Sequence, residues 1–259
     1  MNFTYVALLL AIALFLSMLA LIEVGRRIGS AWLSTHKDGL PKGTNVAEGA
    51  IMALMGLIIA FTFSGAASRF EGRRHLITEE TNNIRTAFLR TDLLPEESRP
   101  ELRELFRRYL DSRLAIYSEV ENSSLTNASI AESQMVQDEI WKKAVAACRR
   151  PDVVGRPEVL VVPALNAMFD ITTTRFAATR NHPPLAIYIL MGSLSLISSL
   201  LVGYGLSVNK VRFWLHPFVF VALTSLSFYV IVDLEFPRLG FIHVDAADQL
   251  LIDLRKSMN

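Results

Sequence analysis

Three apolar side chains in the second apolar segment of the chain are spaced so that they could form a constriction for ions. Ala53, Leu57 and Phe61 recur every four residues, so they lie along one side of a helix. If several copies of this helix surrounded an axis, each position would form a ring. Leu57 and Phe61 would then make an apolar gate that closes by excluding water. The same spacing also suits a helix that faces lipid or a neighbouring helix, so spacing alone leaves both interpretations open.

A carboxylate and a strip of small residues accompany these side chains. Glu48 stands at the start of the segment, where a ring of carboxylates would raise the local concentration of cations at a pore mouth. A carboxylate at this place is also favourable at any helix N-terminus. Small residues recur at spacings of three and four along the same helix, which permits close approach of another helix. They are Gly49, Ala53, Gly56 and Ala60.

The sequence carries no signature of catalysis or of a metal site. Its five histidines are scattered, and no cluster of His, Cys, Asp or Glu has the spacing of metal ligands. Neither a phosphate-binding glycine loop nor a nucleophile elbow is present. Glu79 and Glu80 are adjacent, so on a helix they diverge and do not form an acid–base pair. We therefore expect no enzyme and no cofactor, and no basic patch with aromatics indicates nucleic acid.

The elements that must position the candidate residues are membrane helices. Crossing a bilayer takes about 20 mostly apolar residues in a helix. Four stretches of the 259-residue chain meet this requirement, at residues 3–25, 49–67, 183–207 and 213–232. The chain is therefore predicted to be an all-α integral membrane protein with four transmembrane helices. Its predicted partners include the lipid bilayer in which these helices lie.

The polar residues between the second and third of these helices are predicted to form a helical, water-exposed domain. Residues 101–120 repeat apolar side chains at helical spacing between charged ones. We expect a short polar loop at 26–46 and a second helix that continues past residues 69–74 into the domain. The predicted organisation is two membrane helices in 1–67, the inserted domain in 68–182, two more membrane helices in 183–235, and an amphipathic tail in 236–259. Because the tail has few basic residues, we expect it to pack on the domain rather than on lipid.

Two sequence motifs resemble those of a known family. Residues 60–74 (AFTFSGAASRFEGRR) resemble the second-helix signature of bestrophins, and residues 233–240 (DLEFPRLG) resemble the acidic segment with Pro and Gly that follows their fourth helix. The residues that carry the resemblance are Arg69, Glu71, Gly72, Arg73, Asp233, Glu235, Pro237 and Gly240. The chain is most similar to bacterial membrane proteins with a bestrophin-like domain.

The resemblance implies a homopentamer of a bacterial inner membrane, in which the second helix of each subunit lines an ion pathway. Aligned on Phe61, the three apolar neck positions of bestrophins fall on Ala53, Leu57 and Phe61, so the first ring is made by the smallest of the three. Animal members bind calcium through an acidic cluster after the fourth helix. Asp245 and Asp248 are too sparse to predict such a site here.

Basic residues stand on both sides of the predicted membrane helices. Cytoplasmic loops usually carry the excess of Lys and Arg. Arginines flank the domain at 69–74 and 175–180, whereas other basic residues occupy the opposite side at 26–42 and 210–212. The resemblance to bestrophins implies a cytoplasmic domain, and this is the orientation that we expect.

These observations predict a bestrophin-like oligomeric channel for inorganic ions, with the second transmembrane helix lining the pore. One alternative is a non-conducting membrane scaffold or sensor whose helical domain binds a partner. A membrane enzyme is a weaker alternative, because the one dense polar group in a membrane segment is a set of serines at 193–199 that no base accompanies. Serines at such positions suit close helix packing.

Overall fold

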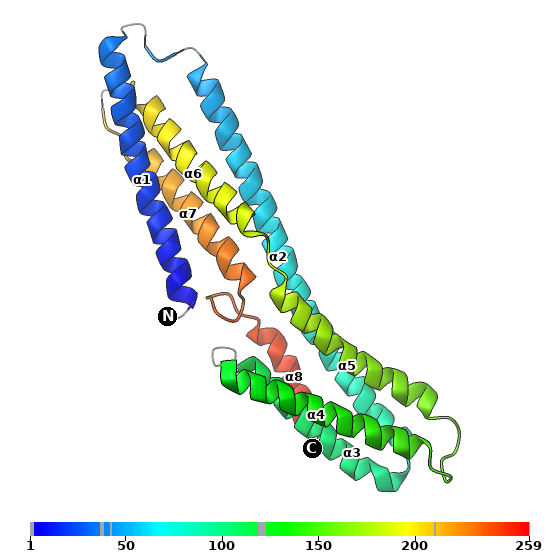
Figure 1. The fold of residues 1–259 in the computed structure, drawn as a ribbon. Coiled ribbons are helices and arrows are strands. Elements are labelled where there is room, and N and C mark those ends of the chain that lie inside the picture. The colour runs from blue at the N-terminus through cyan, green and yellow to red at the C-terminus, as the bar shows by residue number, and fades with distance from the viewer. Residues whose placement is uncertain (1–2, 37–38, 42, 119–122, 210, 259) are drawn as a thin grey trace. The chain divides into compact units, whose positions relative to one another are not determined.

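The regular elements of the protein are helices. The computed structural model describes residues 3–36, 39–41, 43–118, 123–209 and 211–258, and no strand occurs among them (Figure 1). The all-α prediction is therefore confirmed. The α-helices are α1 (Phe3–Thr35), α2 (Thr44–Arg90), α3 (Arg99–Ser118), α4 (Ser123–Cys148), α5 (Glu158–Arg180), α6 (Leu185–Leu206), α7 (Leu215–Glu235) and α8 (Asp245–Ser257). Two short 3-10 helices, Thr91–Leu93 and Glu96–Ser98, connect α2 to α3.

Four helical runs in the described part of the chain are long and apolar enough to cross a membrane. They are α1, the run Thr44–Leu93 that contains α2, the run Glu158–Leu206 that ends with α6, and α7. In a bilayer core a chain must satisfy its backbone hydrogen bonds internally, which a long uncharged segment can do only as a helix or a closed barrel. The prediction of four membrane helices is confirmed by length and composition.

The end of α1 differs from the prediction made from the sequence, whereas the continuation of α2 beyond its apolar segment agrees with it. The predicted loop at 26–46 is wrong for residues 26–35 and 44–46, because α1 continues to Thr35 and α2 begins at Thr44. Arg27 Nε donates to Glu23 Oε1 one turn earlier, at 3.1 Å, which supports the helix across the charged residues. The turn comes at Gly39 and Gly43, whose φ angles of 91° and 93° suit glycine. As expected, α2 continues without a break for 47 residues.

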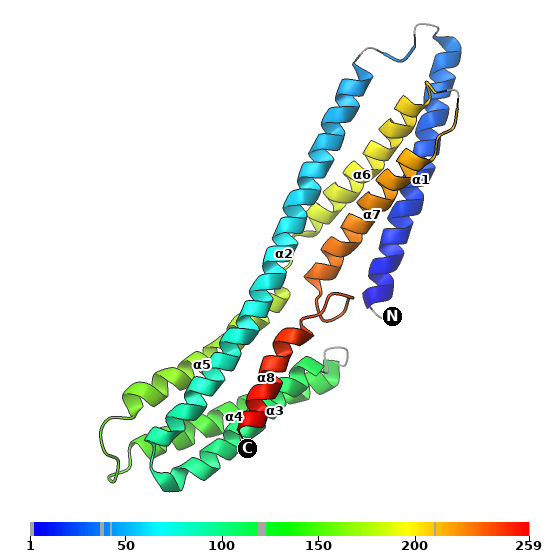
Figure 2. The ribbon, with the colours of Figure 1, turned by 180° about the vertical axis from the view of Figure 1, so that it is seen from behind.

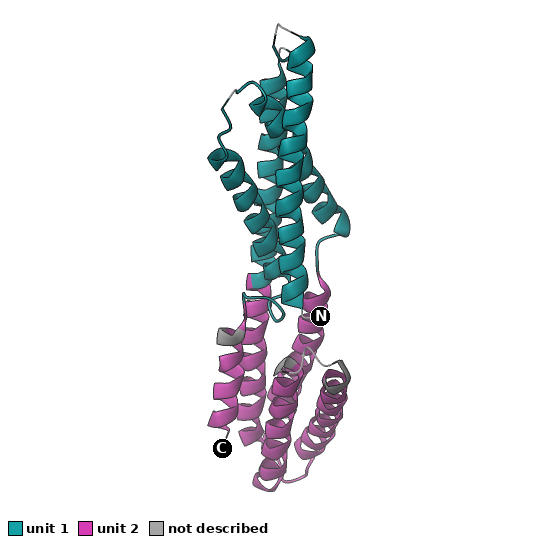
Figure 3. Cartoon of the chain, turned by 90° about the vertical axis from the view of Figure 1, so that its left-hand side faces the viewer, with its two compact units in different colours: residues 1–70, 182–242 teal, residues 71–181, 243–259 magenta. Residues whose placement is uncertain are grey.

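The chain divides into two compact units, which Figure 3 shows in different colours. Unit 1 contains residues 1–70 and 182–242, and unit 2 contains residues 71–181 and 243–259. Because α2 begins before residue 70 and ends after it, this helix contributes residues to both units.

Unit 1 is built on close packing between α1 and α6, which lie side by side in Figures 1 and 2. A Cβ on Gly203 would lie 2.0 Å from the carbonyl oxygen of Ile22, and a Cβ on Gly25 would lie 2.0 Å from that of Leu200. Glycine is therefore required at both positions, as in small-residue contacts between membrane helices. Met18 and Ile22 of α1 also form a buried cluster with Val221 of α7.

Unit 2 has a buried core of large side chains on α3, α4 and α5. These include Phe106, Tyr109, Ile140, Leu165 and Met168. The amphipathic tail forms α8, which packs on α3 through a buried apolar face that includes Leu251 and Leu254. Arg255 Nε donates to Asp111 Oδ1 across this contact at 2.7 Å.

Candidate functional site

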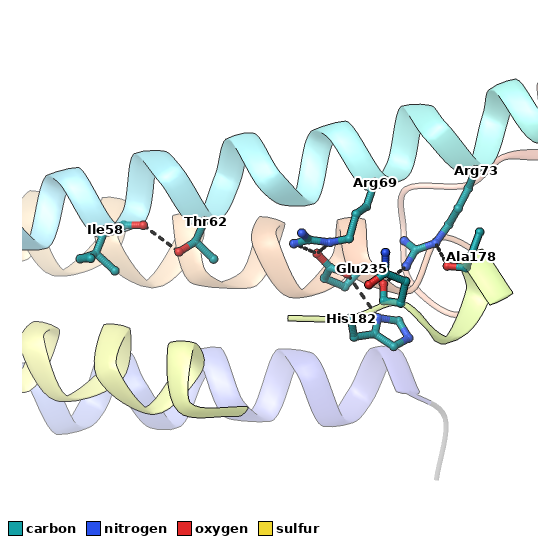
Figure 4. Close-up of polar contacts among 8 residues, drawn as sticks. Ile58, Thr62, Arg69, Arg73, Ala178, His182 and Glu235 are labelled. Atoms are coloured by element: carbon teal, nitrogen blue, oxygen red, sulfur yellow. Dashed lines mark hydrogen bonds and ion pairs between the residues drawn. The ribbon is translucent and has the colours of Figure 1, made fainter. Parts of the chain in front are cut away.

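Helix α2 has one face that packs on its own chain. Met55, Thr62 and Ala66 are buried on this face, and Ala66 belongs to an apolar cluster with Met191 of α6 and Ile231 of α7. The hydroxyl of Thr62 donates to the backbone carbonyl of Ile58 at 2.7 Å, so its polar group is satisfied within the helix (Figure 4). These contacts fix which side of α2 faces the rest of unit 1.

The three predicted neck residues lie on sides of α2 that its own chain leaves uncovered. Leu57 precedes Ala66 by nine residues, which is about two and a half turns, so the two lie on opposite faces. The side chains of Leu57 and Phe61 are 50% and 68% exposed, and Ala53 is exposed as well. Their role as a neck stays a prediction, because a ring requires further copies of the chain.

The strip of small residues on α2 is also open. A Cβ added at Gly49 or at Gly56 would meet nothing within 4 Å. Ala53 and Ala60 of the same strip are exposed. Among the described residues of the chain, nothing therefore packs closely on Gly49 or Gly56, in contrast to the glycines of α1 and α6.

Glu48 lies on a different side of α2 from the predicted neck. It precedes Leu57 by nine residues, so it shares the packed face rather than the exposed one. Its Oε2 lies 2.8 Å from the place that a Cβ on Gly205 of α6 would occupy. The carboxylate thus lies beside Gly205 of α6. A place at a pore mouth stays a prediction for this residue.

Two of the motif residues meet in an ion pair that links α2 to α7. Nε and Nη2 of Arg69 both donate to Oε1 of Glu235, at 2.8 and 2.5 Å (Figure 4). Nδ1 of His182, which precedes α6, lies 3.2 Å from the other carboxylate oxygen. The Glu235 side chain is fully buried, whereas those of Arg69 and His182 keep 26% and 28% of their exposure. Three segments that are distant in sequence are therefore held by one carboxylate.

Three further motif residues build the turn after α7. The carboxylate of Asp233 accepts hydrogen bonds from the backbone N–H groups of Phe241 and Ile242, at 2.8–3.1 Å. A Cβ on Gly240 would lie 1.9 Å from Asp233 Oδ1, so only glycine allows the chain to fold over this carboxylate. Pro237 is buried within the same turn. The acidic residue, the proline and the glycine of the motif thus have a structural explanation.

The remaining motif residues belong to unit 2. Arg73 is buried and donates to the backbone carbonyls of Ala178 and Asn181, each at 3.1 Å, which ties α2 to the end of α5 (Figure 4). Glu71 is exposed and pairs with Arg74 at 2.9 Å. A Cβ on Gly72 would meet nothing within 4 Å, so nothing in the single chain explains glycine there.

Unit 2 contains a buried carboxylate, Glu80, that was not predicted from the sequence. Glu80 is fully buried, accepts a hydrogen bond from Arg113 Nε at 2.7 Å, and also pairs with Arg175. Burial by itself raises the pKa of this carboxyl, but the two guanidiniums outweigh it and hold the pKa below its usual range. One signal was present in the sequence. Glu80 occupies a helical stripe with Ile77 and Ile84, and a charge in an apolar stripe needs a partner.

The polar groups of the membrane helices do not gather into a reactive centre in the part of the chain that the structure describes. Ser195 donates to the carbonyl of Met191, and Ser199 donates to that of Ser195, which is packing within α6. Among the described residues, no group of three or more His, Cys, Asp and Glu side chains is placed to hold a metal ion.

Comparison with known proteins identifies the family. None of the curated proteins matches the chain. The crystal structure of a bacterial bestrophin homolog from Klebsiella pneumoniae, solved with a point mutation, is similar to it with a TM-score of 0.69 and 13% sequence identity. The similarity covers 95% of this chain and 98% of that one, and it shows a shared fold. The Bestrophin-like domain matches residues 12–248, which confirms the resemblance drawn from the two motifs. The chain therefore belongs to the family of proteins with a Bestrophin-like domain.

Proposed function

We propose that the protein is an oligomeric ion channel in which α2 of each subunit lines the pore. The family and the fold support a channel, because bestrophins, which both motifs resemble, are ion channels. By the same resemblance the assembly is a homopentamer of a bacterial inner membrane. The polar residues 68–182 form its cytoplasmic domain in this proposal, inserted between the second and third membrane helices.

The observation that carries the proposal is the uncovered side of α2. Of the four membrane candidates this helix is the least covered by its own chain, with 17% of its most apolar stretch buried, against 28% for α7. Its packed face is nonetheless well defined by Thr62 and Ala66. A helix that is seated on one side and open on the other is suited to contacts with other subunits and with a central path.

The chemistry of such a path follows from the side chains that α2 presents. Rings of Leu57 and Phe61 would form an apolar constriction that passes ions only when it is wide enough to stay wet. The ring of Ala53 would be wider than either. The open strip around Gly49 and Gly56 would let neighbouring α2 helices approach closely. For Glu48 to contribute a ring at the mouth, its carboxylate would have to leave its place against Gly205.

The ion pair at the other end of the membrane segment supports the same arrangement. Arg69 and Glu235 fix α2 to α7 with a buried carboxylate. A pore helix needs such an anchor, because a small rotation of α2 would turn Leu57 and Phe61 away from the axis. In this proposal Arg69 and Glu235 act as supports of the pore helix and not as ion ligands.

Ion flux from liposomes that contain the purified, assembled protein tests the proposal. Phe61→Ala removes the largest ring and is expected to raise flux several-fold, since a wider apolar constriction stays wet more often. The matched control is Phe218→Ala on α7, an apolar side chain of similar exposure, 52%, which is expected to leave flux unchanged. Absence of flux from assembled wild-type protein, with a stoichiometric partner that co-purifies, would support the scaffold or sensor alternative instead.

A further inference from the structure

A small pocket lies at the end of unit 1 where α1 passes its last apolar turn and the connection from α6 to α7 begins. Its volume is about 30 Å³. Its polar lining includes Glu23 and Arg26 of α1 and Arg212 of the connection, and Phe213 and Trp214 contribute to its apolar lining. None of these residues belongs to the proposed pore or to its supporting ion pair.

Two segments independently place this pocket at the edge of the hydrocarbon core. The apolar part of α1 before Glu23 has about 20 residues, and that of α7 after Trp214 has about 18, so each spans about 27–30 Å. The far ends of these helices are joined, because Thr4 donates to the carbonyl of Leu239 at 2.6 Å. The two lengths are similar, and Glu23 and Trp214 line the same pocket, so both lie near this boundary. Tryptophan is typical of this boundary.

The charges of the pocket favour an anion. Three guanidiniums surround a single carboxylate. Oε1 of Glu23 lies 3.1 Å from Arg27 Nε and 3.6 Å from Arg212 Nη2, and Oε2 lies 4.0 Å from Arg26 Nε. Of these three arginines, Arg26 and Arg212 line the pocket together with Glu23, so the formal charge of the lining is two positive and one negative, or +1. The Arg212 side chain is 55% exposed, so its guanidinium can reach a ligand. Guanidiniums bind phosphate oxygens through paired hydrogen bonds.

The carboxylate in the pocket adds a second requirement. Oε2 of Glu23 is buried and has no hydrogen-bond partner among the described residues. A buried acceptor without a donor costs free energy, so a ligand that brings a hydroxyl donor would relieve that cost. The pocket thus combines donors for a phosphate with an acceptor for a hydroxyl.

We propose that this pocket binds the headgroup of an acidic phospholipid that carries hydroxyl groups, of which phosphatidylglycerol is the simplest. Arg26 and Arg212 hold the phosphate, and Glu23 Oε2 accepts from the glycerol hydroxyl. The exposed rings of Phe213 and Trp214 lie beside the glycerol backbone of the lipid, and its acyl chains extend along the apolar surface of the helices. The inference rests on the membrane placement of unit 1 and not on conduction.

Binding of defined lipids to the delipidated full-length protein tests the proposal, with native mass spectrometry to count the bound molecules. Phosphatidylglycerol is expected to bind at least about tenfold more tightly than phosphatidylcholine, because a hydrogen bond from its hydroxyl to the charged Glu23 is worth about a factor of ten. Phosphatidylcholine has the same phosphate but no hydroxyl, and it brings a quaternary ammonium close to the guanidiniums. Phosphatidylmethanol, which has the same charge but no hydroxyl, is expected to bind more weakly than phosphatidylglycerol. Equal binding of these two acidic lipids would contradict the role given to Glu23.

The variants separate this site from general attraction to charge. Arg26→Gln with Arg212→Gln is expected to abolish the preference, and Arg85→Gln, which removes an exposed arginine of unit 2, is expected to keep it. If the double variant fails to fold, Arg212→Gln alone retains the test, because its side chain is exposed. Equal binding of phosphatidylglycerol and phosphatidylcholine to the wild type would overturn the proposal. So would an unchanged preference in the arginine variants, or displacement of the lipid by equimolar glycerol 3-phosphate, which would assign the site to a soluble phosphate.

Discussion

Breaking the ion pair between Arg69 and Glu235 is expected to destabilise unit 1 strongly. Glu235→Gln keeps the shape of a fully buried side chain but leaves the guanidinium without its charged partner. Removing one partner of a buried pair costs about 3–5 kcal/mol. Because Arg69 and His182 each keep roughly a quarter of their exposure, water can reach them in part. We therefore expect Glu235→Gln to lower the free energy of unfolding by about 3 kcal/mol, which corresponds to a loss of about 6–12 °C in Tm.

Thermal unfolding of the purified protein in detergent, followed by circular dichroism, measures this loss. The matched control is Glu71→Gln, since Glu71 belongs to the same motif and also pairs with an arginine. The side chains of Glu71 and its partner Arg74 are 67% and 45% exposed, so the variant should lose about 0–1 kcal/mol of unfolding free energy. The double variant with Arg69→Gln should lose clearly less than the sum of the two single variants. Equal melting of Glu235→Gln and Glu71→Gln, or full additivity in the double variant, would refute the assignment of a buried clamp.

Two further outcomes follow from the packing and from the buried charges. Gly203→Ala places a Cβ against the backbone of α1 and is expected to cost about 1–3 kcal/mol in thermal unfolding, whereas Gly192→Ala, where a Cβ would meet nothing within 4 Å, should melt like the wild type. The lowered pKa of Glu80 means that its ionised form stabilises unit 2 above the unfolded pKa of about 4.3, and that this contribution is lost as the pH falls further through the folded pKa. Melting curves from pH 7 downward should therefore show a loss of stability below about pH 4.3 that Glu80→Gln lacks. An identical dependence of Tm on acid pH in both proteins would contradict the buried pairing of Glu80 with Arg113 and Arg175.

The sequence was sufficient for the membrane helices because their physical requirement is local. A run of about 20 uncharged residues in a bilayer can only be helical or part of a closed barrel, and α1, α2, α6 and α7 follow this rule. The end of α1 was not predictable in the same way. Residues 26–35 include charged and small polar side chains, yet they continue α1 to Thr35, and an ion pair one turn apart supports only the first of these turns.

The supporting contacts were beyond sequence reasoning because they join distant segments. Arg69 and Glu235 are 166 residues apart, and nothing in either motif indicates that the two meet. Likewise, His182 was one of five scattered histidines until the fold placed it beside Glu235. The proposed neck of Leu57 and Phe61 differs from these cases, since its partners would lie in other copies of the chain.

Single-particle imaging of the protein in nanodiscs tests most directly whether the α2 helices of several subunits surround an axial ion path. The proposal predicts a ring of subunits with α2 nearest the axis, a continuous central path, and Leu57 and Phe61 directed toward that path. A monomer, a dimer, or a ring whose axis is plugged or filled with lipid would contradict the channel.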